Sequence, residues 1–266
     1  MGRPVDSHFR AGREAMLKAA LLLAGKDLRL ILGAGRRSGV FLPAQAALLG
    51  LLVIFLFSLA PDLNPDMVPG LAPQGSAAQN ARLAPGLAAI LFWVVSLLAQ
   101  TLIFQRLYGL EQAGGIRLAL LTAPSPPQAV WLGKTLAGLA LLVLVQAVLG
   151  PALILLLRQE LAGPLWPALS GILLADLGLA ALGALLGAFS AAPDRHTGRA
   201  SLPAILSLPL LIPPLLAAAK LCLLNLVPAV AAPAPEAASC LGILAAFDGL
   251  AIAAALVLFP FVFREE

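Results

Sequence analysis

The sequence has few charged residues and almost none of the side chains that enzymes use for catalysis. Asp, Glu, Lys and Arg make up 11% of the 266 residues, whereas they make up about a quarter of a typical soluble domain. The histidines are His8 and His196. A zinc hydrolase needs paired histidines with a carboxylate, and a serine nucleophile needs a neighbouring histidine. We therefore expect no catalytic residue, no metal site and no enzyme activity in this chain.

Cysteine is equally scarce, with Cys222 and Cys240 as the two positions. Two cysteines cannot form a disulfide framework. Both are predicted near the same end of a helical bundle, so a bridge between them stays open, although two unpaired apolar cysteines are the favoured interpretation. The N-terminal stretch also lacks the clean apolar core of a cleavable signal, because Lys26, Asp27 and Arg29 interrupt it.

Apolar residues, by contrast, are abundant: they make up 61% of the chain, and its mean hydropathy is +0.97. Apolar runs of about 20 residues have the length needed to cross the hydrocarbon core of a bilayer as a helix. Within lipid the backbone must satisfy its own hydrogen bonds, which favours helices. We therefore predict an all-α integral membrane protein with six transmembrane helices. The predicted spans are residues 39–60, 86–104, 130–157, 168–190, 202–226 and 241–263.

The basic residues are concentrated on one side of this predicted topology. Fourteen of the 17 Lys and Arg residues fall in residues 1–37, 105–134, 191–200 and the C-terminal tail. Basic loops of membrane proteins face the cytoplasm, so we predict that both termini are cytoplasmic. The same asymmetry explains the basic sequence pI of about 9.6 without a nucleic-acid partner.

Ahead of the first span, residues 14–37 are predicted to form an amphipathic helix with a basic stripe, which suits the cytoplasmic headgroup boundary of the bilayer. A frayed, lipid-seeking leader is the alternative. Residues 1–13 are a polar N-terminal extension. Residues 14–266 form a single transmembrane permease domain, because the outer loops, residues 61–85 and 227–240, are too short to hold another domain and are predicted to be irregular.

One predicted cytoplasmic segment, residues 105–127, is longer and more polar than a plain connection requires. It carries Glu111, a glycine pair, Arg117 and several prolines. The sequence GKT that follows at residues 133–135 is similar to the end of a phosphate-binding loop. Such a loop follows a strand and uses consecutive backbone N–H donors, whereas here three prolines precede GKT and remove donors. We interpret GKT as a coincidence, or as a lysine at the membrane edge.

Three charged residues lie inside the predicted spans at similar depth: Asp176, Lys220 and Asp248. Charges inside lipid are costly, so they mark helix contacts or functional sites. We expect the small-residue faces around the two aspartates, one of which carries Gly183 and Gly187, to meet and Lys220 to pair with one or both aspartates. An ion pair that holds the helices in register and a substrate contact or gate both stay open. Extension of Lys220 toward the interface is the alternative.

The fifth predicted span carries four prolines: Pro203, Pro209, Pro213 and Pro214. An interior proline removes a backbone donor and clashes with the preceding turn, so we expect this helix to bend. A bent helix beside a buried charge suggests a moving wall or a transport pathway. Plain helix packing is an equal alternative.

Several motifs together resemble the CcmB family, the membrane (channel) subunit of the haem exporter used in cytochrome c maturation, which is of the ABC-2 type. They are FQRLYGLEQAGG, LTAPSP, LGK, LPAILSLPLLIPPLL and the C-terminal LFPFVFREE, together with RLAPG ahead of Trp93. The resemblance covers residue 16 to the end. The family commonly has more acidic residues around the glycine pair, where this chain has Glu111 alone, followed by Arg117.

The resemblance implies that a separate cytosolic ABC ATPase, similar to CcmA, binds ATP and docks against the polar cytoplasmic segment. The implied coupling residues are Glu111, Gly114, Gly115, Arg117 and Pro124. It also implies a homodimer in the bacterial inner membrane that works with CcmC-like and CcmD-like subunits and a CcmE-like haem chaperone. Haem is the candidate cargo, either exported or released with the loaded chaperone, and no cofactor is expected to be bound by this chain itself.

Two other functions stay open from the sequence. An ABC-2 permease for another cargo, such as a drug, a lipid or a glycan, would share the same membrane architecture. A non-transporting scaffold would hold the maturation complex in the membrane without movement driven by nucleotide.

Overall fold

The protein forms a bundle of helices in the computed structural model. The structure describes residues 4–33, 42–63, 85–112, 126–159, 165–190, 202–226 and 234–264. The helices are α1 (Pro4–Gly33), α2 (Leu42–Leu63), α3 (Pro85–Gln112), α5 (Pro127–Leu156), α6 (Leu165–Ser190), α7 (Leu202–Leu226) and α8 (Ala234–Arg264). These described residues contain no strand, which confirms the all-α prediction for this part of the chain.

Each predicted span overlaps one helix, but several helices extend beyond the predicted limits. α3 continues through residues 105–112, so the start of the predicted cytoplasmic segment is helical. α8 begins at Ala234, inside a region predicted to be an irregular loop. α1 begins at Pro4 and includes most of the polar N-terminal extension. The helices extend beyond the predicted spans because the spans were defined by apolar residues alone. Polar residues such as Glu, Gln, Arg and Lys end an apolar run, but they are good helix formers and can continue the helix.

Four stretches of these helices are long and apolar enough to cross a membrane: Gly86–Gly109, Pro127–Leu156, Ala168–Phe189 and Glu236–Val262. The described parts of α2 and α7 contain shorter apolar stretches, Pro43–Leu59 and Leu211–Leu223. A helix rises about 1.5 Å per residue, so even the shortest of the four covers about 33 Å, enough for the hydrocarbon core. The chain is therefore a helical membrane protein in which four described helices have spanning length.

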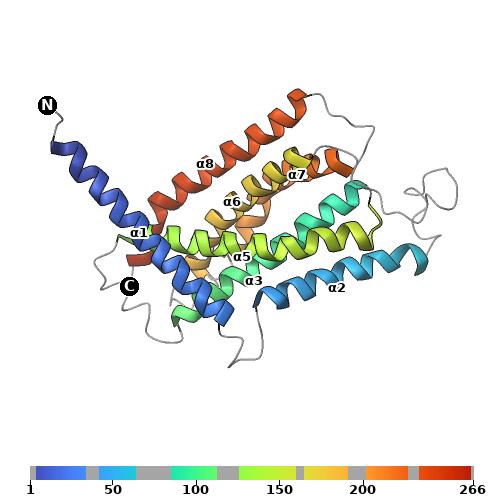
Figure 1. The fold of residues 1–266 in the computed structure, drawn as a ribbon, viewed down its shortest axis with the longest axis horizontal. Helices are drawn as coiled ribbons and strands as arrows, with labels where there is room; N and C mark the ends of the chain where they lie inside the picture. Colours follow the sequence, from blue (N-terminus) through green and yellow to red (C-terminus); the bar gives the residue numbers. More distant parts are fainter. Residues whose placement is uncertain are drawn as a thin grey trace.

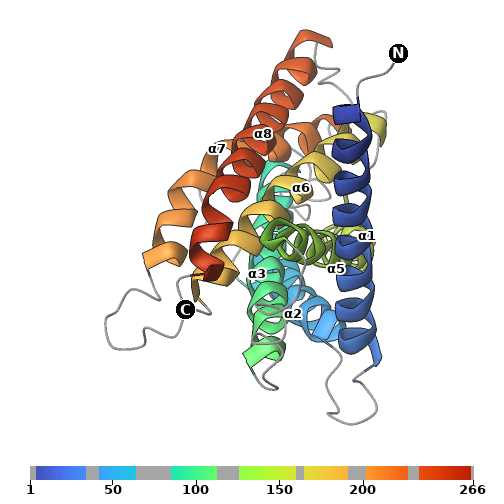
Figure 2. The ribbon, with the colours of Figure 1, turned by 90° about the vertical axis from the view of Figure 1, so that its left-hand side faces the viewer.

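The helices from α2 to α8 lie roughly along one direction, and α1 crosses one end of them (Figure 1). Figure 2 looks at that end and shows α1 running across α5, which is seen nearly end-on. α1 packs on α5, whereas α6 contacts α3, α5, α7 and α8. α5 also contacts α2, α3, α6 and α8, so α5 and α6 together form the centre of the bundle. We call the end crossed by α1, which holds the end of α3 and the start of α5, the α1 end of the bundle.

α1 has a small-residue face toward the bundle and a leucine face away from it. Ala20, Ala24 and Ile31 are buried and lie on one side of the helix. On the other side Leu21 and Leu22 are 62% and 75% exposed. Exposed leucines of this kind need a cover of lipid or protein, which agrees with the lipid-boundary position predicted for this helix.

The helices around α6 approach closely because glycines make room for aromatic rings. The Phe104 ring of α3 lies against Gly138 of α5 and Gly183 of α6, where any larger side chain would overlap it. Gly187, one turn further along α6, makes room for Tyr108 in the same way. This glycine spacing is a packing surface, as expected for membrane helices. It faces α3, however, so the prediction that this small-residue face meets the face of Asp248 is wrong.

α7 is one continuous helix in spite of its prolines. Pro203 stands at the second residue, where the backbone N–H would have no helical partner in any case. Pro209, Pro213 and Pro214 lie further inside and each remove one backbone donor. Pro213 is exposed and Pro214 is buried. The bend and the moving wall expected from these residues stay predictions.

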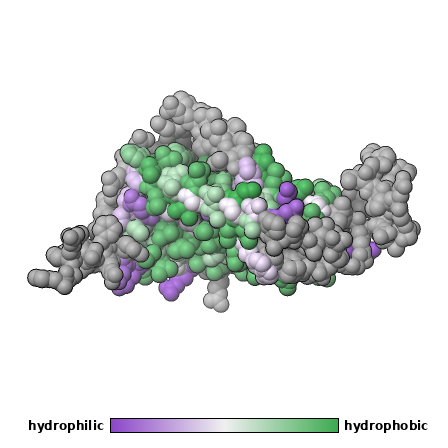
Figure 3. Space-filling model, turned by 90° about the horizontal axis from the view of Figure 1, so that it is seen from above, coloured by the Kyte–Doolittle hydropathy of each residue, from purple (hydrophilic) through white to green (hydrophobic). Residues whose placement is uncertain are grey.

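Hydrophobic side chains dominate the middle of the bundle on the face shown in Figure 3, with hydrophilic colour mainly toward its two ends. Large apolar side chains are exposed on several helices, among them Leu48, Leu98, Leu155 and Val257. A soluble monomer rarely exposes large continuous apolar areas. A lipid environment accounts for this surface.

Candidate coupling site at the α1 end

A buried group of charges joins three helices at the α1 end. The Lys134 amine of α5 lies 2.7 Å from Glu111 Oε1 at the end of α3 and 3.0 Å from Asp27 Oδ2 of α1. The Lys134 side chain is 2% exposed, and those of Glu111 and Asp27 are 5% and 6% exposed. We call Asp27, Glu111 and Lys134 the charge cluster. Its members are far apart in the sequence, so the cluster exists only in the packed bundle.

Further groups stabilise the charges of the cluster. The Lys134 amine donates a hydrogen bond of 2.8 Å to the carbonyl oxygen of Leu107 and lies 5.2 Å from the centre of the Tyr108 ring. A cation is favoured near the C-terminal end of a helix and over an aromatic ring. Lys26, with its side chain 37% exposed, lies 3.3 Å from Asp27 Oδ1. Two ammonium groups therefore face two carboxylates, and the buried charges are balanced.

Close approach of α1 and α5 at this point depends on Gly133. A Cβ on this residue would lie 3.0 Å from the Ala20 carbonyl oxygen, so the two backbones meet beside Lys134. The Thr135 hydroxyl donates a hydrogen bond to the Trp131 carbonyl oxygen of its own helix. Each residue of the GKT sequence thus has a role in packing within the bundle. This agrees with the sequence-based interpretation that GKT is not part of a nucleotide-binding loop.

The charge cluster joins the end of α3 to the start of α5, the two helices on either side of residues 113–125 in the segment predicted to contact an ATPase. Glu111 is the last residue but one of α3, and α5 begins at Pro127, seven residues before Lys134. Residues 113–125 lie outside the described residues. The same is true of four predicted coupling residues: Gly114, Gly115, Arg117 and Pro124. The fifth, Glu111, is described, and its carboxylate points into the bundle toward Lys134.

Polar side chains also join α3 and α5 to α6. Gln100 and Tyr108 of α3 donate hydrogen bonds of 2.6 and 2.5 Å to carbonyl oxygens of α6. Trp131 of α5 donates one of 3.2 Å to another α6 carbonyl. Since Tyr108 also lies beside the Lys134 amine, these hydrogen bonds connect the charge cluster with the core of the bundle.

The two intramembrane aspartates have different neighbours. Asp176 of α6 is fully buried, and its Oδ1 accepts a hydrogen bond of 2.8 Å from the amide of Gln146, which also donates one of 3.1 Å to Ser96 Oγ. Asp248 of α8 is 5% exposed, and its Oδ1 occupies the space that a Cβ on Gly178 would take. Within the described residues, Asp176 Oδ2 and Asp248 Oδ1 have no hydrogen-bond partner. Asp176 thus contacts a neutral amide of α5, and Asp248 contacts a glycine of α6.

The predicted ion pair of Lys220 with these aspartates is wrong. Lys220 is exposed on α7, and no ion pair joins it to Asp176 or Asp248 among the parts of the chain that the structure describes. Depth along a helix does not determine the direction in which a side chain points around it. The position of Lys220 agrees with the alternative, in which a long basic side chain extends away from the core.

Cys222 and Cys240 are both free. Over the described ranges there is no group of three or more His, Cys, Asp or Glu side chains that could hold a metal ion. The contact between Asp27 and Lys134 was not predicted from the sequence. The available signal was that Asp27 is an acidic residue in a helix that carries a basic stripe, and that Lys134 is the one charged residue of an otherwise apolar helix.

Comparison with known proteins shows the family. The family described as CcmB protein matches residues 16–265. This chain belongs to the CcmB family. The matched region begins at the residue where the resemblance in the sequence begins, so the family prediction is confirmed. A relative, heme exporter protein B of Paracoccus denitrificans, is 34% identical over 205 residues, which cover 77% of this chain and 81% of that protein.

Proposed function

We propose that this chain is the membrane-spanning subunit of an ABC transporter complex in cytochrome c biogenesis, acting in haem export or in ATP-driven release of a haem-loaded chaperone. The observation that carries this proposal is the family match over residues 16–265, together with 34% identity to a heme exporter protein B. The helices of spanning length support the role in a membrane. ATP hydrolysis belongs in this proposal to a separate CcmA-like subunit.

In this proposal α2, α3, α5, α6, α7 and α8 all cross the bacterial inner membrane, and both termini are cytoplasmic. The basic N-terminal helix then puts the α1 end in the cytoplasm. The start of α1 and the end of α8 lie toward this same end in Figure 1. The exposed leucines of α1 enter the headgroup boundary of the inner leaflet.

The charge cluster is the proposed mechanical link between the ATPase and the bundle. The ATPase contacts residues 113–125, including Arg117 and the glycine pair, while Glu111 holds the segment from inside through Lys134. The short ion pairs to Glu111 and Asp27 support this role, because a displacement of the segment reaches α1, α3 and α5 together. The sequence-based prediction of a direct contact between Glu111 and the ATPase is therefore refined to a positioning role.

The partners in this proposal are a second copy of the chain, the CcmA-like ATPase, CcmC-like and CcmD-like membrane subunits and a CcmE-like haem chaperone. Haem is the cargo of the complex. Asp176, Lys220 and Asp248 lie in the part of the bundle that rearranges when the ATPase acts.

The function is tested in a strain that lacks the gene for this chain. We expect c-type cytochromes without covalently attached haem, and recovery when the tagged chain is restored. We also expect the tagged chain to co-purify with an ABC ATPase. Normal cytochrome c maturation in the deletion strain would favour a permease for another cargo. Full recovery with a catalytically inactive ATPase would favour a non-transporting scaffold.

The coupling role is tested by neutralising the whole charge cluster with Asp27→Asn, Glu111→Gln and Lys134→Met together. The variant leaves no buried charge unpaired, and Lys26, which loses Asp27, is partly exposed. We therefore expect a folded chain that still assembles with an ATPase active in ATP hydrolysis. We expect cytochrome c maturation to be lost. Glu14→Gln on the exposed side of α1 is the matched control and should support normal maturation. Normal maturation by the neutralised variant would show that the cluster is only structural.

A further inference from the structure

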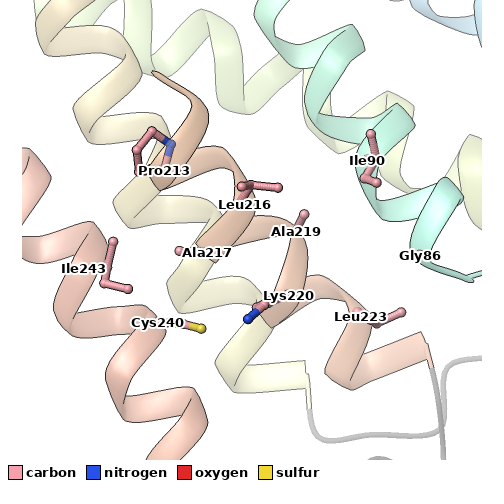
Figure 4. A pocket seen from close by; sticks show the side chains of 10 residues that line it. All are labelled: Gly86, Ile90, Pro213, Leu216, Ala217, Ala219, Lys220, Leu223, Cys240 and Ile243. Atoms are coloured by element: carbon pink, nitrogen blue, oxygen red, sulfur yellow. The ribbon is translucent and has the colours of Figure 1, made fainter. Parts of the chain in front are cut away.

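A groove between α3, α7 and α8 has room for a small apolar group. It lies at the end of the bundle opposite to α1 and has a volume of about 310 Å³, at the lower end of the range for ligand sites. Ile90 of α3, Leu216 of α7 and Ile243 of α8 line it (Figure 4). These side chains are 49%, 55% and 49% exposed. The groove is therefore an apolar surface that opens to the surroundings of the bundle.

Lys220 is the one charged side chain among the residues that line this groove. In Figure 4 its amine lies on the side of α7 that faces Cys240 of α8. Over the described ranges Lys220 forms no ion pair, and this includes Glu236, the acidic residue in the first turn of α8. A cation at a membrane helix surface is stabilised by an anion or by access to the headgroups. The groove thus combines apolar walls with one cation that an anionic ligand would complement.

The position of Lys220 along α7 suits a ligand at the membrane boundary. Lys220 lies six residues before Leu226, the last residue of α7, and Cys240 lies six residues after Ala234, the first residue of α8. Six residues correspond to about 9 Å along a helix. A lysine side chain can extend over part of this distance toward the headgroups. The ammonium group is therefore within reach of a phosphate while the apolar walls lie deeper.

We propose that this groove binds an anionic phospholipid, with one acyl chain against the apolar walls and the headgroup phosphate paired with Lys220. A second copy of the chain is a poorer occupant, because a two-fold contact through this groove would bring the two Lys220 residues close together. A neutral lipid leaves the cation without a partner. The inference depends on the membrane position of the chain and is independent of the proposed cargo.

The lipid site is tested by spin-label spectroscopy of the full chain in phosphatidylcholine vesicles. Trace amounts of phosphatidylglycerol, phosphatidylcholine or stearic acid carry the label on the acyl chain. We expect a larger motionally restricted fraction for labelled phosphatidylglycerol than for the other two labels. Lys220→Gln should remove this preference, and Lys220→Arg should keep it. Ile243→Trp should lower the restricted fraction by filling the groove.

Arg158→Gln is the matched control, because Arg158 is exposed just beyond the end of α5 and does not line the groove. It should leave the preference for phosphatidylglycerol unchanged. Helical circular dichroism confirms that each variant is folded. Equal restriction of all labels by the unaltered chain would overturn the proposal, as would a preference that survives Lys220→Gln, or a stronger preference for stearic acid. Efficient cross-linking of Cys240 between two copies, tested with Cys222→Ser, would show that a second copy occupies the groove.

Discussion

Replacing Lys134 with methionine is the most direct perturbation of the charge cluster. Methionine keeps an unbranched apolar side chain but removes the ammonium group that lies 2.7 Å from Glu111 and 3.0 Å from Asp27. At an effective dielectric constant of about 20, each ion pair contributes about 6 kcal/mol of attraction. Removing the ions from water offsets this by several kcal/mol for each ion. We expect the variant to lose about 3–5 kcal/mol of unfolding free energy, because two buried carboxylates are left without their shared cation.

The assay is unfolding of the purified chain in mixed micelles by added sodium dodecyl sulfate, followed by the loss of helical circular dichroism. The variant in which Asp27, Glu111 and Lys134 are all neutral should recover most of the lost free energy, since replacing a buried ion pair as a whole is often close to neutral. Lys18→Met is the matched control, because Lys18 is exposed on the same helix as Asp27. Its effect should stay within about 0.5 kcal/mol.

Two results would refute this reasoning. If Lys134→Met lowers the unfolding free energy by less than about 1 kcal/mol, the charge cluster contributes no more to stability than exposed ion pairs do. A fully neutral variant as unstable as Lys134→Met would show that the packing of the lysine stem, and not charge balance, sets the energy.

The remaining predictions concern packing and the buried amide. Gly138→Ala should lower the unfolding free energy by about 1–3 kcal/mol in the same titration, because its Cβ would overlap the Phe104 ring. Gly249→Ala, with nothing within 4 Å of the new Cβ, should be neutral or stabilise by up to about 1 kcal/mol; equal effects of the two would contradict the close contact. Gln146→Leu should cost about 1–3 kcal/mol because Asp176 loses its donor. Asp176→Asn should be tolerated in thermal unfolding of the purified variants, and the reverse order would contradict a role for this hydrogen bond.

The helical fold was predictable because its signal is local. Apolar runs of spanning length mark the helices, since lipid cannot hydrogen-bond to the backbone. The limits of the helices were less predictable. Residues 105–112 include Gln105, Arg106 and Glu111, yet they continue α3, because a helix needs satisfied backbone hydrogen bonds and not apolar side chains.

Lys134 and Lys220 show why the site could not be predicted in the same way. From the sequence, Lys220 is the lysine expected to pair with aspartates, and Lys134 is either a chance member of the GKT sequence or a lysine at the membrane edge. In the structure Lys134 is the buried partner of two carboxylates, whereas Lys220 is exposed beside a groove. The difference depends on which face of each helix is turned toward a neighbour, and for Lys134 on how α1 lies across α5.

The sequence by itself determined the membrane class, the helical content and the family, because apolar run length, polarity and motifs are properties of short stretches that act without the rest of the chain. The tertiary structure alone decided that Asp27 meets Lys134, that Gly183 and Gly187 receive rings of α3, and that Asp176 binds a neutral amide. These contacts join residues many positions apart. Their free energy arises from the removal of charges, rings and amides from their surroundings when the helices pack, and this cannot be read from any single helix.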